Sequence, residues 1–261
     1  MPPFSVLVFS KTSGYRHTSI PAGISCFQSL AARTDLFTVT ASEDASLFTP
    51  ESLSKYAVIV LLQTSGDIFN QERLDAMKGF VRNGGGVLGI HSAASGMPKD
   101  EWYERLIGAH FDMHPPAEHG TILPSSSSGH VTLASSSLPK HDWLDEYYNF
   151  YFNPSNPNTH LPSHSSHATP HPSHNPALTI LLKGDPSTFS GSKMGSEHPL
   201  AWCQEFEGGR SWYIALGHFD EAWADEWFAG MVGRGLIWCA RREEDVEIGG
   251  KGFWVGGGEE M

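Results

Sequence analysis

The segment at residues 83–94, NGGGVLGIHSAA, constrains the fold more than any other part of the chain. Before it, apolar residues recur at helical spacing, which predicts a helix over about 71–83 with Asn70 as its N-cap. The three glycines should end this helix, because glycine enters the left-handed conformation without a steric penalty. The short apolar run 87–90 then predicts a buried parallel strand. His91 should therefore stand at the carboxyl end of that strand.

The carboxyl ends of parallel strands are where open α/β sheets bind their ligands. The small residues Ser92, Ala93 and Ala94 leave room for a ligand beside the His91 imidazole. A histidine at a strand end is also often a structural residue. The position of His91 is thus compatible with a catalytic and with a structural role.

Strands and helices alternate along the first part of the chain. The expected strands are 4–9, 37–41, 56–62 and 87–90, with helices between them. This alternation predicts a doubly wound, mostly parallel sheet, because right-handed crossovers place all the loops that follow such strands at one edge. Arg16 and His17 in the first loop and Asp67 in the third should therefore converge on His91.

The second part of the chain predicts an antiparallel extension. The expected strands are 131–134, 178–182, 198–206 and 210–216. The glycine-rich turn 207–209 joins the last two as a hairpin. A helix over about 223–240 should close the domain. We expect one domain over residues 1–240, because no linker separates two periodic halves, and a loosely held tail at 241–261.

Polar residues gather at three places in this second part. The run 109–116 places imidazoles and a carboxylate beside two prolines, which predicts a rigid polar loop that carries function. The run 142–150 combines aromatic and acidic residues, which suits either sugar recognition or a core aromatic cluster with exposed acids. His218 follows directly on the last expected strand.

The composition limits the partners. The 261 residues carry a formal net charge of -12 with scattered basic residues, which argues against nucleic acid and membrane partners and favours a neutral or cationic small molecule. Cys26, Cys203 and Cys239 lie in apolar runs without a CxxC spacing, as reduced core cysteines do. The sequence shows neither a secretion-signal pattern nor an apolar run long enough to span a membrane, so we expect a soluble cytoplasmic protein. A homo-oligomer is compatible with the sequence.

The stretch 153–176 differs in character from the rest, being almost wholly Pro, Ser, Asn, Thr and His. Its five histidines recur at spacings of four and three: His160, His164, His167, His171 and His174. The interleaved prolines forbid the helix that this spacing would otherwise favour. We therefore expect a flexible surface loop inserted in the domain, which could bind metal adventitiously.

Seven segments together carry a resemblance to a known family. They are KTSGYRHTSIP at 11–21, TSGD at 64–67, GGGVLGIHSAA at 84–94, WYERLIGAHFDMHP at 102–115, DEYYNF at 145–150, MGSEHPLAWC at 194–203 and GRSWYIALGH at 209–218. In this order they resemble the ThuA-like (trehalose utilisation) family. The resemblance implies a three-layer, doubly wound, mostly parallel sheet of the flavodoxin-like, class I glutamine amidotransferase-like kind, with an antiparallel hairpin extension. The long His-rich insert and the tail depart from the family.

The same resemblance excludes one activity. Amidotransferases carry a nucleophilic Cys at the turn between strand and helix, where this chain resembles them with His91 in place of the thiol. No cysteine lies near that turn, so glutamine hydrolysis through a Cys–His pair is not expected. Ser92 is a weak alternative nucleophile, because nothing local supplies the strained turn that a GxSxG motif provides.

The family name implies carbohydrate metabolism, and the resemblance implies an oxidised (3-keto) disaccharide or glycoside as the small-molecule partner. Such substrates can be cleaved by proton abstraction beside the ketone and loss of the glycosidic oxygen, which requires a base, an acid and an electrophile. The expected catalytic residues are His91, His114, Glu146 and His218. The expected substrate-binding residues are Arg16, His17, Asp67, Tyr148, Asn149 and His198.

Two alternatives stay open. The sequence identifies no certain cofactor, but His91, His114 and His218 with a carboxylate could bind Zn²⁺ or another divalent ion. In the other alternative, this edge of the sheet is a non-catalytic module that binds sugar or protein. Trp102, Tyr147 and Tyr148 would then be its stacking surfaces. Catalysis is favoured if two histidines and Glu146 come within hydrogen-bond reach of one shared space.

Overall fold

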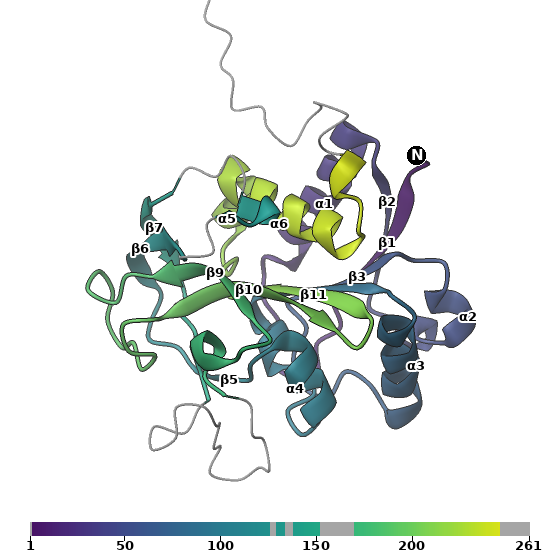
Figure 1. The fold of residues 1–261 in the computed structure, drawn as a ribbon, viewed down its shortest axis with the longest axis horizontal. Coiled ribbons are helices and arrows are strands. Elements are labelled where there is room, and N and C mark those ends of the chain that lie inside the picture. The colour runs from purple at the N-terminus through teal and green to yellow at the C-terminus, as the bar shows by residue number, and fades with distance from the viewer. Residues whose placement is uncertain (1, 126–128, 134–137, 152–169, 246–261) are drawn as a thin grey trace, which may run out of the picture.

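The computed structural model describes residues 2–125, 129–133, 138–151 and 170–245. Its main sheet has the strand order β2-β1-β3-β4-β11-β10-β9-β6-β7 (Figure 1). The parallel strands are β2 (Phe37–Ser42), β1 (Phe4–Phe9), β3 (Val58–Leu62), β4 (Gly86–Ile90) and β11 (Gly209–Ile214). The antiparallel strands are β10 (Pro199–Phe206), β9 (Thr179–Gly184), β6 (Glu118–Pro124) and β7 (Lys140–Asp145).

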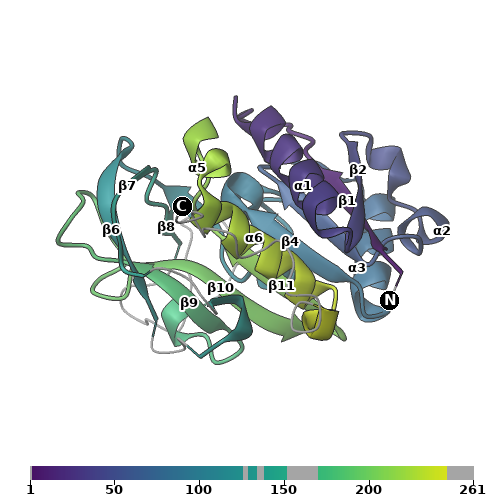
Figure 2. The ribbon, with the colours of Figure 1, turned by 90° about the horizontal axis from the view of Figure 1, so that it is seen from above.

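Helices cover both faces of the parallel half. One face carries α1 (Ile20–Thr34), α5 (Asp220–Ala224) and α6 (Glu226–Cys239), and the other carries α2 (Pro50–Leu53), α3 (Gln71–Arg82) and α4 (Glu101–Ile107) (Figures 1 and 2). Every residue of β3 and β4 is buried, as expected of strands covered on both faces. This arrangement confirms the three-layer, doubly wound α/β fold.

The central segment folds as its local chemistry predicts. The Asn70 side chain caps α3 by accepting a 3.0 Å hydrogen bond from the backbone N–H of Arg73. Gly84 follows the end of the helix with φ +93°, the left-handed conformation that glycine adopts most easily. The chain then enters β4, and His91 stands at its carboxyl end as the first residue of the 3-10 helix η2 (His91–Ser95).

The antiparallel extension is wider than a hairpin. The turn between β10 and β11 has positive φ at Glu207 and Gly208, which suits a tight hairpin turn. Beyond β10, however, the sheet continues through three more strands, of which β9 was predicted and β6 and β7 were not. The expected polar loop at 109–116 contains β5 (Phe111–Met113), which pairs with β8 (Asn149–Phe150) in a separate small sheet.

One predicted strand is wrong, and one predicted helix has different bounds. Instead of a strand at 131–134, the chain forms the 3-10 turn η3 (Val131–Leu133), in which the Thr132 carbonyl accepts a hydrogen bond from Arg234 Nε at 2.7 Å. The predicted helix at 223–240 is two helices, α5 and α6. It breaks because the Asp225 carboxylate caps α6, accepting from the backbone N–H groups of Trp227 and Phe228.

The insert and the tail fall largely outside the described residues, which leave out 152–169 and 246–261. At the end of the expected surface loop, His171 and Pro172 are buried, the latter in the 3-10 turn η4 (Pro172–His174), so that part of the prediction is wrong. At the start of the tail, Arg241 forms an ion pair with Glu205 at 2.6 Å. The three cysteines are buried, and no helix of the described residues is both long and apolar enough to cross a membrane.

Candidate functional site

The loops that follow the parallel strands meet at one edge of the sheet. The strand order reverses between β1 and β3, and the loops leaving these two strands are joined by a hydrogen bond from Ser13 N to Ser65 O at 2.7 Å. His17 comes from the first of these loops, His91 directly follows β4, and His218 follows β11. The topology therefore gathers three histidines at the edge where such sheets bind ligands.

Three imidazoles converge on one carboxylate oxygen of Glu146. Its Oε2 atom lies 3.0 Å from His218 Nδ1, 3.4 Å from His91 Nε2 and 3.5 Å from His114 Nε2. His17 joins them from the side, with ring centroids 4.7 Å from His91 and 5.1 Å from His218. We call these five residues the histidine–glutamate cluster.

His91 is held in a strained conformation at the centre of the cluster. Its φ of +52° is unusual for a residue other than glycine, and such strain occurs often at functional sites. Its Nδ1–H donates to the Ala215 carbonyl at 2.6 Å, and its own carbonyl accepts from the Tyr213 hydroxyl at 2.8 Å. Its Nε2 contacts the Tyr148 hydroxyl at 2.8 Å. The imidazole is therefore fixed from three sides with Nε2 toward Glu146.

Asp145 positions Glu146, although the sequence analysis did not single it out. Its fully buried carboxylate accepts hydrogen bonds from the backbone N–H groups of Gly217 at 2.8 Å, Glu146 at 2.9 Å and His218 at 3.3 Å. The end of β7 is thereby joined to the loop after β11. The only sequence signal was that Asp145 adjoins Glu146 in an acid-rich run.

The cluster opens to solvent on one side. The His91 side chain is 0% exposed, whereas Glu146 is 12%, His218 19% and His114 33% exposed. His17 is buried as well. A ligand that enters from solvent would thus meet His114 first and reach His17 and His91 last.

The charges of the cluster are set by burial and by mutual contact. Burial, together with the nearby His91 and His218, lowers the pKa of His17 to about 3. Burial would raise the pKa of Glu146, but its contacts with the His218 and His91 imidazoles outweigh burial and hold that pKa well below its usual range. Burial opposes protonation of His218, yet its hydrogen bond to Glu146 raises its pKa. Near neutral pH, His17 is neutral and Glu146 is a carboxylate.

Sequence comparison assigns the chain to a family. Residues 5–239 match the ThuA family, whose description is trehalose utilisation. The chain belongs to the ThuA family. No curated protein matches it.

Solved structures of two ThuA-like proteins and of a third protein share the fold. One from Bacteroides uniformis is 20% identical with a TM-score of 0.66, covering 93% of this chain and 91% of its own. One from Parabacteroides merdae is 18% identical with a TM-score of 0.67, covering 91% and 90%. A cytoplasmic protein from Salmonella typhimurium is 12% identical with a TM-score of 0.57, covering 90% and 98%. At these identities the likeness shows the fold alone.

Four of the expected substrate-binding residues of this ThuA-family chain make no side-chain hydrogen bond, ion pair or ring contact with the cluster among the described residues. Arg16 pairs with Glu43 at 2.6 Å on the surface, and both side chains are half exposed. Asp67 is exposed. The Asn149 amide bonds the loop around Gly191, and the buried His198 imidazole contacts Ser192 Oγ at 2.8 Å. The other two, His17 and Tyr148, lie in or against the cluster.

The aromatic residues expected to stack on a ligand are buried: Trp102, Tyr147 and Tyr148. Trp102 lies on α4, and its Nε1–H donates to Glu207 in the turn between β10 and β11. The Tyr147 ring stacks on Phe189, with centroids 4.0 Å apart. The Tyr148 ring stacks on His91, with centroids 4.2 Å apart. These rings support the fold and the cluster and offer no open stacking face.

Ser92 contacts the cluster, with its Oγ 3.3 Å from His17 Nδ1. The left-handed residue of this turn is His91, so the strained position that carries the nucleophile in related turns belongs to the imidazole. Ser92 is therefore better placed to orient His17 than to attack a substrate.

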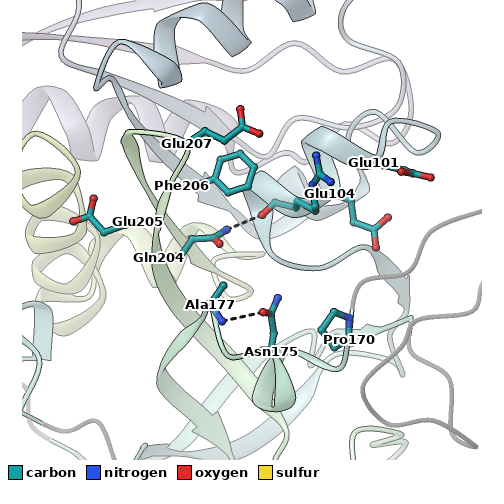
Figure 3. Close-up of a pocket in the computed structure, with 10 residues that line it drawn as sticks. Glu101, Glu104, Pro170, Asn175, Ala177, Gln204, Glu205, Phe206 and Glu207 are labelled. Carbon is teal, nitrogen blue, oxygen red and sulfur yellow. Dashed lines mark hydrogen bonds between the residues drawn. The ribbon is translucent and has the colours of Figure 1, made fainter.

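An acidic cavity of about 410 Å³ lies elsewhere (Figure 3). Its lining includes Glu101, Glu104, Glu205 and Glu207, and Gln204 Nε2 donates to the Arg105 carbonyl at 2.7 Å beside it. The cavity adjoins the turn that precedes β11, whereas the cluster lies past the opposite end of that strand. The cavity is thus separate from the histidine–glutamate cluster.

Proposed function

We propose that this ThuA-family protein is an enzyme that cleaves oxidised (3-keto) disaccharides or glycosides by acid–base chemistry at the histidine–glutamate cluster. The observation that carries the proposal is the convergence of His91, His114 and His218 on Glu146 Oε2 within 3.0 to 3.5 Å. The family description of trehalose utilisation supports a disaccharide substrate. The partial exposure of His114 and His218 supports access of a small molecule to these groups.

The proposed reaction is an elimination. A ketone at C3 of the sugar acidifies the hydrogen on C2, and a base removes it as a proton. The electron pair of the broken C–H bond forms an enolate, which expels the glycosidic oxygen from C1, and an acid protonates that oxygen. The products are an unsaturated keto-sugar and a free alcohol. Later addition of water across the new double bond makes the net change a hydrolysis.

The cluster contains the groups that this reaction requires. Glu146 is a carboxylate near neutral pH and shares a 3.0 Å hydrogen bond with His218, so a base and a proton donor lie side by side. His114 is the member most open to solvent and is placed to exchange a proton with the substrate together with Glu146. Its Nδ1–H is held by the Pro115 carbonyl at 2.8 Å, which directs Nε2 into the cluster.

We also place the enzyme in the cytoplasm. The three cysteines are unpaired, which suits a reducing compartment. The similar fold of a cytoplasmic Salmonella protein agrees with that location.

The test compares p-nitrophenyl glucoside oxidised at C3 with the unoxidised parent. The wild-type protein should release p-nitrophenol from the oxidised glycoside only. His114→Gln should lower kcat by roughly 10²–10⁴-fold, the usual contribution of a general acid or base. His119→Gln is the matched control, because His119 is an exposed histidine paired with Asp142 outside the cluster, and it should leave kcat unchanged. No release from the oxidised glycoside, or equal release from both, would contradict the proposal.

A further inference from the structure

We propose that the cluster binds one divalent metal ion of the zinc class, with His17, His91, Glu146 and His218 as its ligands. One potential ligand atom from each of these residues lies within 4.8 Å of the others, and among the described residues no other such group of histidine, cysteine and acidic side chains occurs. The site itself rests on geometry. Its catalytic role rests on the proposed function.

The spacing of the ligand atoms suits such an ion. His218 Nδ1 lies 3.0 Å from Glu146 Oε2 and 3.3 Å from His91 Nε2, and the latter two atoms are 3.4 Å apart. Zinc bonds of about 2.0–2.1 Å at tetrahedral angles place neighbouring ligand atoms about 3.3–3.4 Å apart. An ion therefore fits among these three atoms with little rearrangement.

The hydrogen bonds around the cluster place an imidazole lone pair close to the Glu146 carboxylate, which favours a cation between them. The Nδ1–H groups of His91 and His114 donate to the backbone carbonyls of Ala215 and Pro115. A neutral imidazole has a single N–H, so the Nε2 atom of each then carries a lone pair near the Glu146 carboxylate, at 3.4 and 3.5 Å; at His91 the Tyr148 hydroxyl can donate to that lone pair. The His114 lone pair and the carboxylate repel one another unless an extra proton or a cation lies between them.

The surrounding contacts match those of metal-bound histidines. A histidine ligand normally donates its second N–H to a carbonyl or carboxylate, as His91 does to Ala215. His17 Nδ1 can donate to Ser92 Oγ at 3.3 Å, which leaves its Nε2 for the ion. Three imidazoles and one carboxylate favour zinc, iron or manganese over magnesium and calcium, which prefer oxygen ligands.

The proposed ligand set differs by one histidine from the set expected from the sequence. It contains His17 in place of His114. Once Glu146 and His218 hold the ion, His114, which stays outside, takes over from Glu146 as the base. The Tyr148 hydroxyl, now 2.8 Å from His91 Nε2, would be released from that atom by the ion and could donate to the substrate. The ion would polarise the C3 ketone and stabilise the enolate.

The test uses the full chain without an affinity tag, stripped with a chelator and titrated with Zn²⁺ by calorimetry. We expect one saturable site per chain and, at free Zn²⁺ about 100 times Kd, a rise in Tm of roughly 5–10 °C. His17→Gln and Glu146→Gln should each weaken binding by more than the roughly 10–100-fold that loss of an outer contact costs. His114→Gln should keep the site, as should a variant with His160, His164 and His167 all replaced by Asn.

The inference is overturned if the stripped wild type shows no single saturable site. It is overturned equally if the His17 and Glu146 variants bind Zn²⁺ as the wild type does, or if the variant of the His-rich tract loses the ion. Should a ligand variant fail to fold, the wild-type titration and Tm still decide. Zinc binding without cleavage of the keto-glycoside would leave the site standing and refute the proposed function. Cleavage of the keto-glycoside by a protein that binds no metal would refute the metal site and leave the proposed function standing.

Discussion

The buried carboxylate of Asp145 accepts a 2.8 Å hydrogen bond from the backbone N–H of Gly217. This contact joins the end of β7 to the loop after β11, two segments that lie at opposite sides of the antiparallel extension in the strand order. Because Glu146 and His218 adjoin these two residues in the chain, Asp145 fixes both partners of the central ion pair at once.

Asp145→Asn should separate positioning from chemistry. The amide has one oxygen to accept from three backbone N–H groups, so the free energy of unfolding should fall by about 1.5–3 kcal/mol, the usual worth of hydrogen bonds to a charged group. The Zn²⁺ affinity should fall with it, since Glu146 and His218 lose their common anchor. Urea unfolding and calorimetry measure the two effects. A variant with wild-type affinity would show that Asp145 does not position the cluster.

His91→Ala should destabilise the protein as well as inactivate it. An exposed residue at the edge of the sheet would contribute little to stability. His91, however, is fully buried, and its removal takes away a hydrogen-bond partner of the Ala215 carbonyl and of the Tyr148 hydroxyl. We expect the free energy of unfolding to fall by about 2–4 kcal/mol. His91→Asn should lose less, because asparagine tolerates the left-handed backbone at this position. Equal losses in urea unfolding would argue against strain at His91.

Ser92→Ala tests the serine nucleophile directly. If Ser92 only orients His17, turnover of the oxidised glycoside at saturating Zn²⁺ should stay within about tenfold of wild type, as for the loss of an outer contact. Loss of a covalent nucleophile costs far more, about 10⁴-fold or above. A loss of that size, together with a trapped covalent intermediate in mass spectrometry, would favour the nucleophile.

His198 should make stability depend on pH. Burial lowers its pKa to about 4 in the folded protein, against about 6.5 in the unfolded chain, so between these values the unfolded chain binds more protons. Its contribution is therefore complete above pH 6.5 and is lost as the pH falls toward 4, with a slope of up to about 1.4 kcal/mol per unit. His198→Asn, which keeps a partner for Ser192, should flatten this part of the stability curve. Parallel curves would contradict the assignment.

The sequence predicted the parallel half of the fold because its signals there are local. The Asn70 cap, the Gly84 turn and the fully apolar β3 and β4 each follow from a few neighbouring residues. The antiparallel extension was harder to predict, since β6 enters the main sheet by pairing with β9, which is distant in the chain. The apolar pattern at 131–134 was misleading because Arg234 takes the Thr132 carbonyl that a strand would need.

The same distinction applies to the site. His91 and His218 could be predicted because each follows the end of a strand. His17 could be predicted because loops that follow parallel strands meet at one edge of the sheet. No local pattern shows that Asp145 is buried or that Arg16 turns outward to Glu43, because both depend on segments far away in the sequence. The burial of Trp102 and Tyr147 likewise depends on packing that the sequence does not reveal.

The most direct test of the central claim is exchange of the C2 hydrogen of methyl 3-keto-glucoside in D₂O, followed by proton NMR. If the cluster removes that proton, the wild-type protein should catalyse exchange at C2. Glu146→Gln should slow the exchange by at least about 100-fold, since it removes the carboxylate on which the three imidazoles converge. Exchange no faster than in buffer, or equal exchange by the wild type and Glu146→Gln, would contradict the account.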